Sequence, residues 1–172
     1  MSDEHANGAA AAATGGQPQQ QPRLAVLAQY VKDLSFENPR APHSLRQGQP
    51  QPQILVNVDV KAQKLDDKST FEVVLTVNAR AEQGDDVGFL AELQYAGLFS
   101  LENFPNEAIE PICMVECPRI LFPFARRILS DVTRDGGFPP LMLETIDFTS
   151  LYRQQKLQQA QQTGAGTPSA DA

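Results

Sequence analysis

The sequence is poor in cysteine and histidine, with two of each among 172 residues. Two cysteines, Cys113 and Cys117, do not provide the disulfide framework that stabilises small secreted domains, so a reducing compartment is expected. A zinc site needs four ligands in a closed geometry, and only His5 and His43 could join the two thiols. We therefore predict neither a metal nor another cofactor, and both cysteines are expected to be small core side chains.

Long apolar runs are also missing. No window approaches the roughly 18 to 20 apolar residues that a membrane-spanning helix needs. The first basic residue is Arg23, and the apolar run before it is confined to residues 9–13, so the pattern of a signal peptide is not met. We expect a soluble cytoplasmic protein without direct membrane insertion.

Basic side chains are scarce, and the net charge is -7. Binding to nucleic acid needs a concentrated basic surface, so no nucleic-acid partner is expected. Residues 24–116 hold 14 acidic and 7 basic side chains, whereas residues 117–157 hold 4 acidic and 6 basic. This asymmetry favours a basic partner for the first part, although an acidic surface that only maintains solubility accounts for it equally well.

Sequence motifs of common enzymes are absent. There is no G-x-S-x-G elbow and no phosphate-binding glycine loop between a strand and a helix. Paired carboxylates occur at residues 66–67 and 85–86, but both pairs lie in expected turns, where aspartate is favoured for local hydrogen bonding. An enzyme that uses Asp85 or Asp86 is the minority alternative, and we predict a protein that is not an enzyme.

Low-complexity sequence at both ends leaves room for one domain. Residues 1–23 are mostly Ala, Gly, Gln and Pro, and residues 158–172 are mostly Gln, Gly, Ala and Thr. Such compositions cannot offset the entropy lost on ordering, so both segments are predicted to be disordered tails. Residues 24–157 are the predicted folded domain.

Four strands are predicted in the first part of this domain. Apolar and polar side chains alternate over residues 53–61, 70–80 and 87–99, as in strands with one buried face. Residues 24–36 are more uniformly apolar, and their valine, tyrosine and leucine favour a further strand. The short connections among the three alternating strands predict antiparallel neighbours.

Helices are predicted in the second part. Apolar residues at helical spacing over residues 121–132 predict the strongest helix, and Gly136 and Gly137 mark its end. An extended segment with two prolines, residues 138–146, leads to a final helix over residues 147–159 with Asp147 as its N-cap. Strands followed by helices indicate the α+β class.

Bulky apolar side chains exceed what this core can bury. They gather at residues 120–124 and again at residues 138–143. A homo-oligomer interface would cover such a surplus, and a groove for an extended or unfolded peptide would use it for binding. Composition alone favours the interface and leaves both interpretations open.

Three segments resemble the SecB family of protein-export chaperones: KDLSFENPRAP at 32–42, GFLAELQYAGLFSL at 88–101, and CPRILFPFARRILSDVTRDGGFPPLMLETIDFTSLY at 117–152. The resemblance covers residues 24–157. It implies a four-stranded antiparallel sheet with two helices packed on one face, assembled as a homotetramer that is a dimer of dimers.

The resemblance also implies a function. Members of the family are ATP-independent chaperones that bind unfolded preproteins, keep them competent for translocation and deliver them to the ATPase SecA. By position, the implied preprotein-binding residues are Phe89, Leu93, Tyr95, Phe124, Phe138 and Leu141. The implied SecA-binding residues are Asp33, Glu37, Leu90 and Glu92.

The C-terminal tail departs from the family pattern. Family members often have an acidic tail, whereas here only Asp171 is charged beyond Lys156, so the resemblance leaves open whether this tail contacts SecA. A purely structural oligomer and a chaperone-like partner of an antitoxin remain alternatives to the export chaperone.

Overall fold

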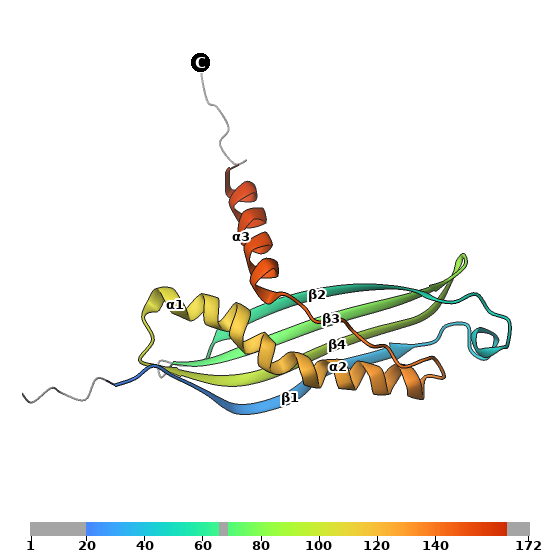
Figure 1. Cartoon of the computed structure of the whole chain (residues 1–172), viewed down its shortest axis with the longest axis horizontal. Coiled ribbons are helices and arrows are strands. Elements are labelled where there is room, and N and C mark those ends of the chain that lie inside the picture. The colour runs from blue at the N-terminus through green and yellow to red at the C-terminus, as the bar shows by residue number, and fades with distance from the viewer. Residues whose placement is uncertain (1–19, 66–68, 165–172) are drawn as a thin grey trace, which may run out of the picture.

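The structure, a computed structural model, describes residues 20–65 and 69–164. Its strands are β1 (Arg23–Glu37), β2 (Gln53–Lys64), β3 (Thr70–Gln83) and β4 (Asp86–Glu102). Its helical elements are the short η1 (His43–Leu45), α1 (Asn106–Pro111), η2 (Ile112–Glu116), α2 (Cys117–Asp135) and α3 (Phe148–Gly164). All four strands form one antiparallel sheet, on which α2 lies lengthwise (Figure 1). The predicted strands and the α+β class are confirmed.

The strands follow one another in the sheet in the order β1-β4-β3-β2. β3 pairs antiparallel with β2 and with β4, its neighbours along the chain, as predicted, and Gly84 between β3 and β4 has the positive φ of 63° that glycine adopts readily. β1 does not pair with β2, its neighbour along the chain, but with the far side of β4. β1 and β2 are therefore the two edges of the sheet.

Alternation along the central strands separates two faces of the sheet. The core face carries side chains that are fully buried under α2, among them Leu75, Leu93 and Phe99. The apolar stripe of α2 packs on this face through Leu121 and Leu129, which are also fully buried. The opposite, outer face carries the alternate residues of the same strands, including Glu72, Leu90 and Glu92.

The end of α2 is set by two glycines. The backbone N–H of Gly137 donates to Arg134 and that of Phe138 donates to Thr133, which is the hydrogen-bond pattern of a Schellman motif. Gly137 takes the positive φ of 87° that the motif requires. A Cβ on Gly136 would lie 2.3 Å from the ring of Phe36 in β1, so close packing also requires glycine there.

The helix before α2 was not predicted. Prolines at 111, 118 and 123 each remove an N–H donor from the helical region, and the ladder has π geometry over η2, between the first two of them. The prolines obscure the helical pattern over residues 106–116. α1, η2 and α2 nevertheless follow one another without a break.

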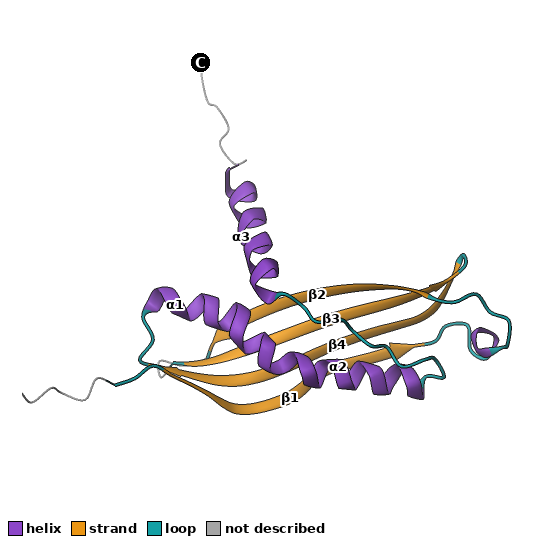
Figure 2. Ribbon diagram, viewed as in Figure 1, coloured by secondary structure: helices purple, strands orange, loops and turns teal. Residues whose placement is uncertain are grey.

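α3 differs from the prediction in position and in length. The Asp147 carboxylate accepts hydrogen bonds from the N–H groups of Thr149 and Ser150, which confirms the predicted N-cap. However, α3 packs chiefly against η2 and projects past the β2 edge (Figure 2), where Gln155 donates a hydrogen bond to Asp59, so of the two predicted helices only α2 lies along the face of the sheet. Its glutamine-rich sequence offers no apolar stripe that could lie flat on the sheet.

The predicted C-terminal tail is helical at its start. α3 continues to Gly164, so residues 158–164 are helical, because glutamine and alanine favour a helix. Residues 1–19 and 165–172 of the predicted tails, and residues 66–68 of a predicted turn, lie outside the described residues. In the described part of the chain, no helix is both long and apolar enough to cross a membrane.

Candidate functional site

An apolar groove runs between edge strand β2 and the extended segment 138–146. It consists of two hollows, of about 240 and 520 Å³, which share Ile54, Leu141 and Met142 and are therefore continuous. We call it the β2 groove. The first hollow is lined by Pro52, Ile54, Phe89, Phe138, Pro139, Pro140, Leu141 and Met142. The second is lined by Ile54, Val56, Val58, Leu141, Met142, Leu143, Glu144, Thr145 and Ile146.

Three aromatic rings support the first hollow. The ring centroids of Phe89 and Phe138 are 5.0 Å apart, and Phe36 lies 5.7 Å from Phe89 and 6.5 Å from Phe138. Phe89 and Phe138 are buried and form its floor, whereas Met142 at its rim is 64% exposed. An apolar ligand that enters this hollow would therefore meet a packed base and an adaptable thioether.

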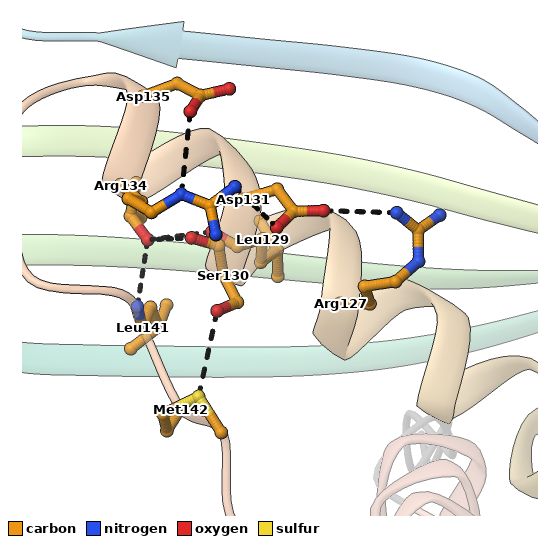
Figure 3. Close-up of polar contacts among 9 residues, drawn as sticks. Arg127, Leu129, Ser130, Asp131, Arg134, Asp135, Leu141 and Met142 are labelled. Carbon is orange, nitrogen blue, oxygen red and sulfur yellow. Dashed lines mark hydrogen bonds and ion pairs between the residues drawn. The ribbon is translucent and has the colours of Figure 1, made fainter.

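The wall of the groove is attached to α2. The hydroxyl of Thr133 accepts a hydrogen bond of 2.9 Å from the backbone N–H of Leu141 (Figure 3). One residue further, the sulfur of Met142 lies 3.7 Å from the hydroxyl oxygen of Ser130. The extended segment is thus held at the point where the two hollows meet.

The predicted preprotein-binding residues fall in two places. Phe89, Phe138 and Leu141 line the β2 groove. Leu93 lies in the core under α2, and Tyr95 stacks on Phe124 with ring centroids 6.1 Å apart. Neither hollow of the β2 groove includes Leu93, Tyr95 or Phe124. For these three residues, contact with preprotein stays a prediction that the groove does not support.

Several groove residues were not predicted. Ile54, Val56 and Val58 appeared in the sequence only as the buried face of a strand, and Met142 only as part of an apolar run. The alternation was visible, but it cannot show that β2 is an edge strand. The extended segment covers this edge only partly, and Val56 remains 44% exposed.

The predicted SecA-binding residues share the outer face. Glu37 pairs with Leu90, and Asp33 pairs with Gln94, the residue that lies on the same face of β4 as Glu92. Leu90 and Glu92 line a shallow hollow of about 220 Å³ on this face. The remaining lining residues are Leu55, Val56, Asn57, Asn78, Ala79, Arg80 and Ala91.

A β-bulge makes this arrangement possible. Opposite β4, Tyr30 pairs with Ala96 and Asp33 pairs with Gln94, and a register shift lies between Val31 and Asp33. The extra residue is Lys32. Side chains alternate with a period of two, so one extra residue puts Asp33 and Glu37 on the same face as Tyr30.

The bulge is held by charge and hydrogen bonding on the outer face. Lys32 forms a 2.9 Å ion pair with Glu72 in β3, and the Tyr30 hydroxyl donates to the same carboxylate. The hydrogen bond from Lys32 has the largest effect on the Glu72 carboxyl and lowers its pKa, and the hydrogen bond from Tyr30 lowers it further. The hydrogen bond to Glu72 in turn raises the pKa of Tyr30 to about 12.

The chemically reactive side chains are not gathered into a site. Cys113 and Cys117 are free and buried, and a hydrogen bond with Cys113 together with burial raises the pKa of the Cys117 thiol. Over residues 20–65 and 69–164, no three potential ligands among His, Cys, Asp and Glu are grouped as a metal site. At the start of β4, Asp86 forms an ion pair with Arg40 at 2.6 Å.

A groove of apolar side chains beside an antiparallel sheet, with an acidic patch on the other face, is the geometry of a binding protein. The family model described as Preprotein translocase subunit SecB matches residues 17–159. This protein belongs to the SecB family and is a protein-export chaperone of that family. Because the family comprises chaperones and not enzymes, the prediction that the protein is not an enzyme is confirmed.

Relatives support this assignment over most of the chain. The protein-export protein SecB of Maricaulis maris is 55% identical over 157 residues, which cover 88% of this chain and 91% of the relative. That of Parvibaculum lavamentivorans is 49% identical over 168 residues, with coverage of 98% and 99%.

A solved structure shows the same fold. It is a SecB-like chaperone of Mycobacterium tuberculosis in complex with a peptide from an antitoxin, and it is 21% identical in sequence. The TM-score is 0.60, and the match covers 72% of this chain and 91% of that chain.

Proposed function

We propose that the β2 groove holds unfolded preproteins in the cytoplasm before export. The observation that carries the proposal is a continuous apolar groove at a sheet edge, where Val56 and Met142 remain exposed. From Ile54 to Val58 it follows about 13 Å of strand, the length of about four extended residues. The related fold from Mycobacterium tuberculosis was solved with a bound peptide, which supports a peptide as the ligand.

The chemistry of the groove suits clients of varied sequence. Burial of one large apolar side chain contributes about 1.5–3 kcal/mol, whereas micromolar affinity needs about 8 kcal/mol. Several client side chains must therefore enter together, which an unfolded chain allows and a folded one does not. Since affinity of this kind depends on apolar burial, we propose that the protein holds its clients without ATP.

Two exposed side chains provide a matched test of client holding. Met142 lies in both hollows of the groove, and Leu157 lies on α3; they are 64% and 63% exposed. We expect Met142→Asp to weaken the suppression of aggregation of an unfolded preprotein without ATP, and Leu157→Asp to leave it unchanged. Equal loss in both variants, or in neither, would contradict the assignment of the groove.

We propose that SecA docks on the outer face at Asp33, Glu37, Leu90 and Glu92. Partly exposed Leu90 lies between Glu37 of β1 and Arg80 of β3 and offers an apolar anchor. Glu92 on β4 and Asp33 further along β1 add negative charge on the same face for encounter with a basic partner. We expect Glu92→Lys to weaken SecA binding and to reduce its salt dependence. Glu107→Lys, an equal charge change on α1, is the control, and equal binding by both variants would exclude this docking face.

We propose that the protein is a homotetramer, a dimer of dimers. On the core-face side of β1, Val26, Val31 and Leu34 are 41%, 46% and 40% exposed. These side chains lie at the β1 edge, opposite the β2 groove in the strand order, so contacts there would leave the groove accessible. Native mass spectrometry should give four copies, and a monomeric mass would contradict this assembly.

A further inference from the structure

The outer wall of the β2 groove has no regular secondary structure of its own. Residues 139–147 belong neither to a helix nor to a strand. Pro139 and Pro140 have no backbone N–H, so after Phe138 the first amide that can anchor the segment is that of Leu141. The position of this wall therefore depends on what that amide contacts.

Thr133, in the last turn of α2, meets this segment twice. Its carbonyl oxygen accepts the N–H of Phe138 at 3.1 Å, and its hydroxyl oxygen accepts the N–H of Leu141 at 2.9 Å. The first bond belongs to the Schellman motif and depends only on the backbone. The second depends on the side chain, and thus on the choice of threonine.

The hydroxyl of Thr133 is held in a defined orientation. It is fully buried, and it donates to the carbonyl of Leu129 at 2.8 Å, with the carbonyl of Ser130 at 3.1 Å as a second acceptor (Figure 3). A hydroxyl has one proton and two lone pairs. With the proton directed into the helix, a lone pair faces Leu141, so the same group satisfies the helix and the wall.

Leu141 occupies the junction of the groove. It lines both hollows, as does Met142, the residue after it. A shift of the Leu141 backbone would change the width of both hollows relative to β2. We propose that Thr133 is a positioning residue for the groove: its hydroxyl fixes the wall at the width that accepts a client side chain. The inference rests on the proposed function of the groove.

The side chain of threonine can be tested without a change of volume. Thr133→Val keeps the shape but leaves the Leu141 N–H without its acceptor, whereas Thr133→Ser keeps the acceptor. Thr76→Val, on the outer face of β3, is the matched control. Two readouts are needed: hydrogen exchange of the Leu141 amide in the free protein, and the affinity of a labelled unfolded preprotein segment.

We expect Thr133→Val to speed exchange at Leu141 and to weaken client binding on the order of tenfold, the equivalent of one lost hydrogen bond. Thr133→Ser should restore both properties, and Thr76→Val should change neither. Unchanged exchange at Leu141 in Thr133→Val would overturn the anchor itself. Faster exchange with unchanged affinity would overturn its role in the groove.

Failure of the proposed function would give a different pattern. If the unmodified protein did not bind the segment at all, the client role of the groove would be wrong and the positioning role toward clients would be overturned with it. The exchange measurement needs no client, so it decides separately whether Thr133 holds the wall.

Discussion

The hydroxyl of Tyr30 in β1 donates a 2.5 Å hydrogen bond to the carboxylate of Glu72 in β3, across the intervening strand β4. Lys32 adds an ion pair to the same carboxylate. Edge strand β1 is thereby joined to the centre of the sheet at the bulge that turns Asp33 and Glu37 outward. Because of this cluster, we expect the stability of the sheet to depend on pH under both alkaline and acidic conditions.

At alkaline pH, the change in folding stability comes from the ionisation of Tyr30. Its pKa is raised to about 12, against about 10 in an unfolded chain. The folded state therefore retains the proton longer, so this contribution to stability is complete below about pH 10 and is lost as the pH rises to about 12. In urea unfolding, the free energy of unfolding should fall less steeply between about pH 10 and 12 for Tyr30→Phe than for the unmodified protein. The same fall in both proteins would contradict the assignment of this pH dependence to Tyr30.

At acidic pH, the change in folding stability comes from protonation of Glu72. Its pKa is lowered by the hydrogen bonds from Lys32 and Tyr30, so the folded state favours the carboxylate. This contribution to stability is present above the ordinary glutamate value of about 4.3 and is lost as the pH falls through the lowered folded value. We expect Glu72→Gln to be less stable at neutral pH and to lose less stability on acidification. The same acid dependence as in the unmodified protein would exclude Glu72 as its source.

The floor of the β2 groove should depend on Gly136. A Cβ at this position would lie 2.3 Å from the ring of Phe36, which packs on Phe89 and Phe138. We expect Gly136→Ala to lower the free energy of unfolding by about 1–3 kcal/mol, as overpacking does. Phe36→Leu removes the ring, so the two changes should not be additive in a double-mutant cycle. Additive effects on the free energy of unfolding would mean that the Cβ at position 136 is accommodated without the Phe36 ring, which would contradict this prediction.

Much of the fold could be predicted from local patterns. Alternation located β2, β3 and β4, because one face of each packs against a core, and two glycines located the end of α2. α1 and η2 were not predicted, because prolines interrupt the helical spacing of apolar residues. The direction of α3 could not be predicted, because it depends on contacts with η2 and not on a pattern within α3.

The candidate site was predicted less completely, and the reason is topological. Phe138 and Leu141 lie in a conspicuous apolar run, and the resemblance to the SecB family implied their role, but their partners Ile54 and Val56 resembled ordinary core residues. Only the pairing of β1 with β4 leaves β2 at an edge. The role of Thr133 is also invisible in the sequence, since it depends on a chain reversal at Gly137 that brings Leu141 back to α2.

The central claim is that unfolded preprotein lies in the β2 groove, and site-specific photo-crosslinking tests it most directly. A photoreactive side chain replaces Met142 in one protein and Leu157 in another, two positions of almost equal exposure. Upon illumination with an unfolded preprotein, we predict strong crosslinking from position 142 and little from position 157. Equal crosslinking from both positions, or stronger crosslinking from position 157, would contradict the claim.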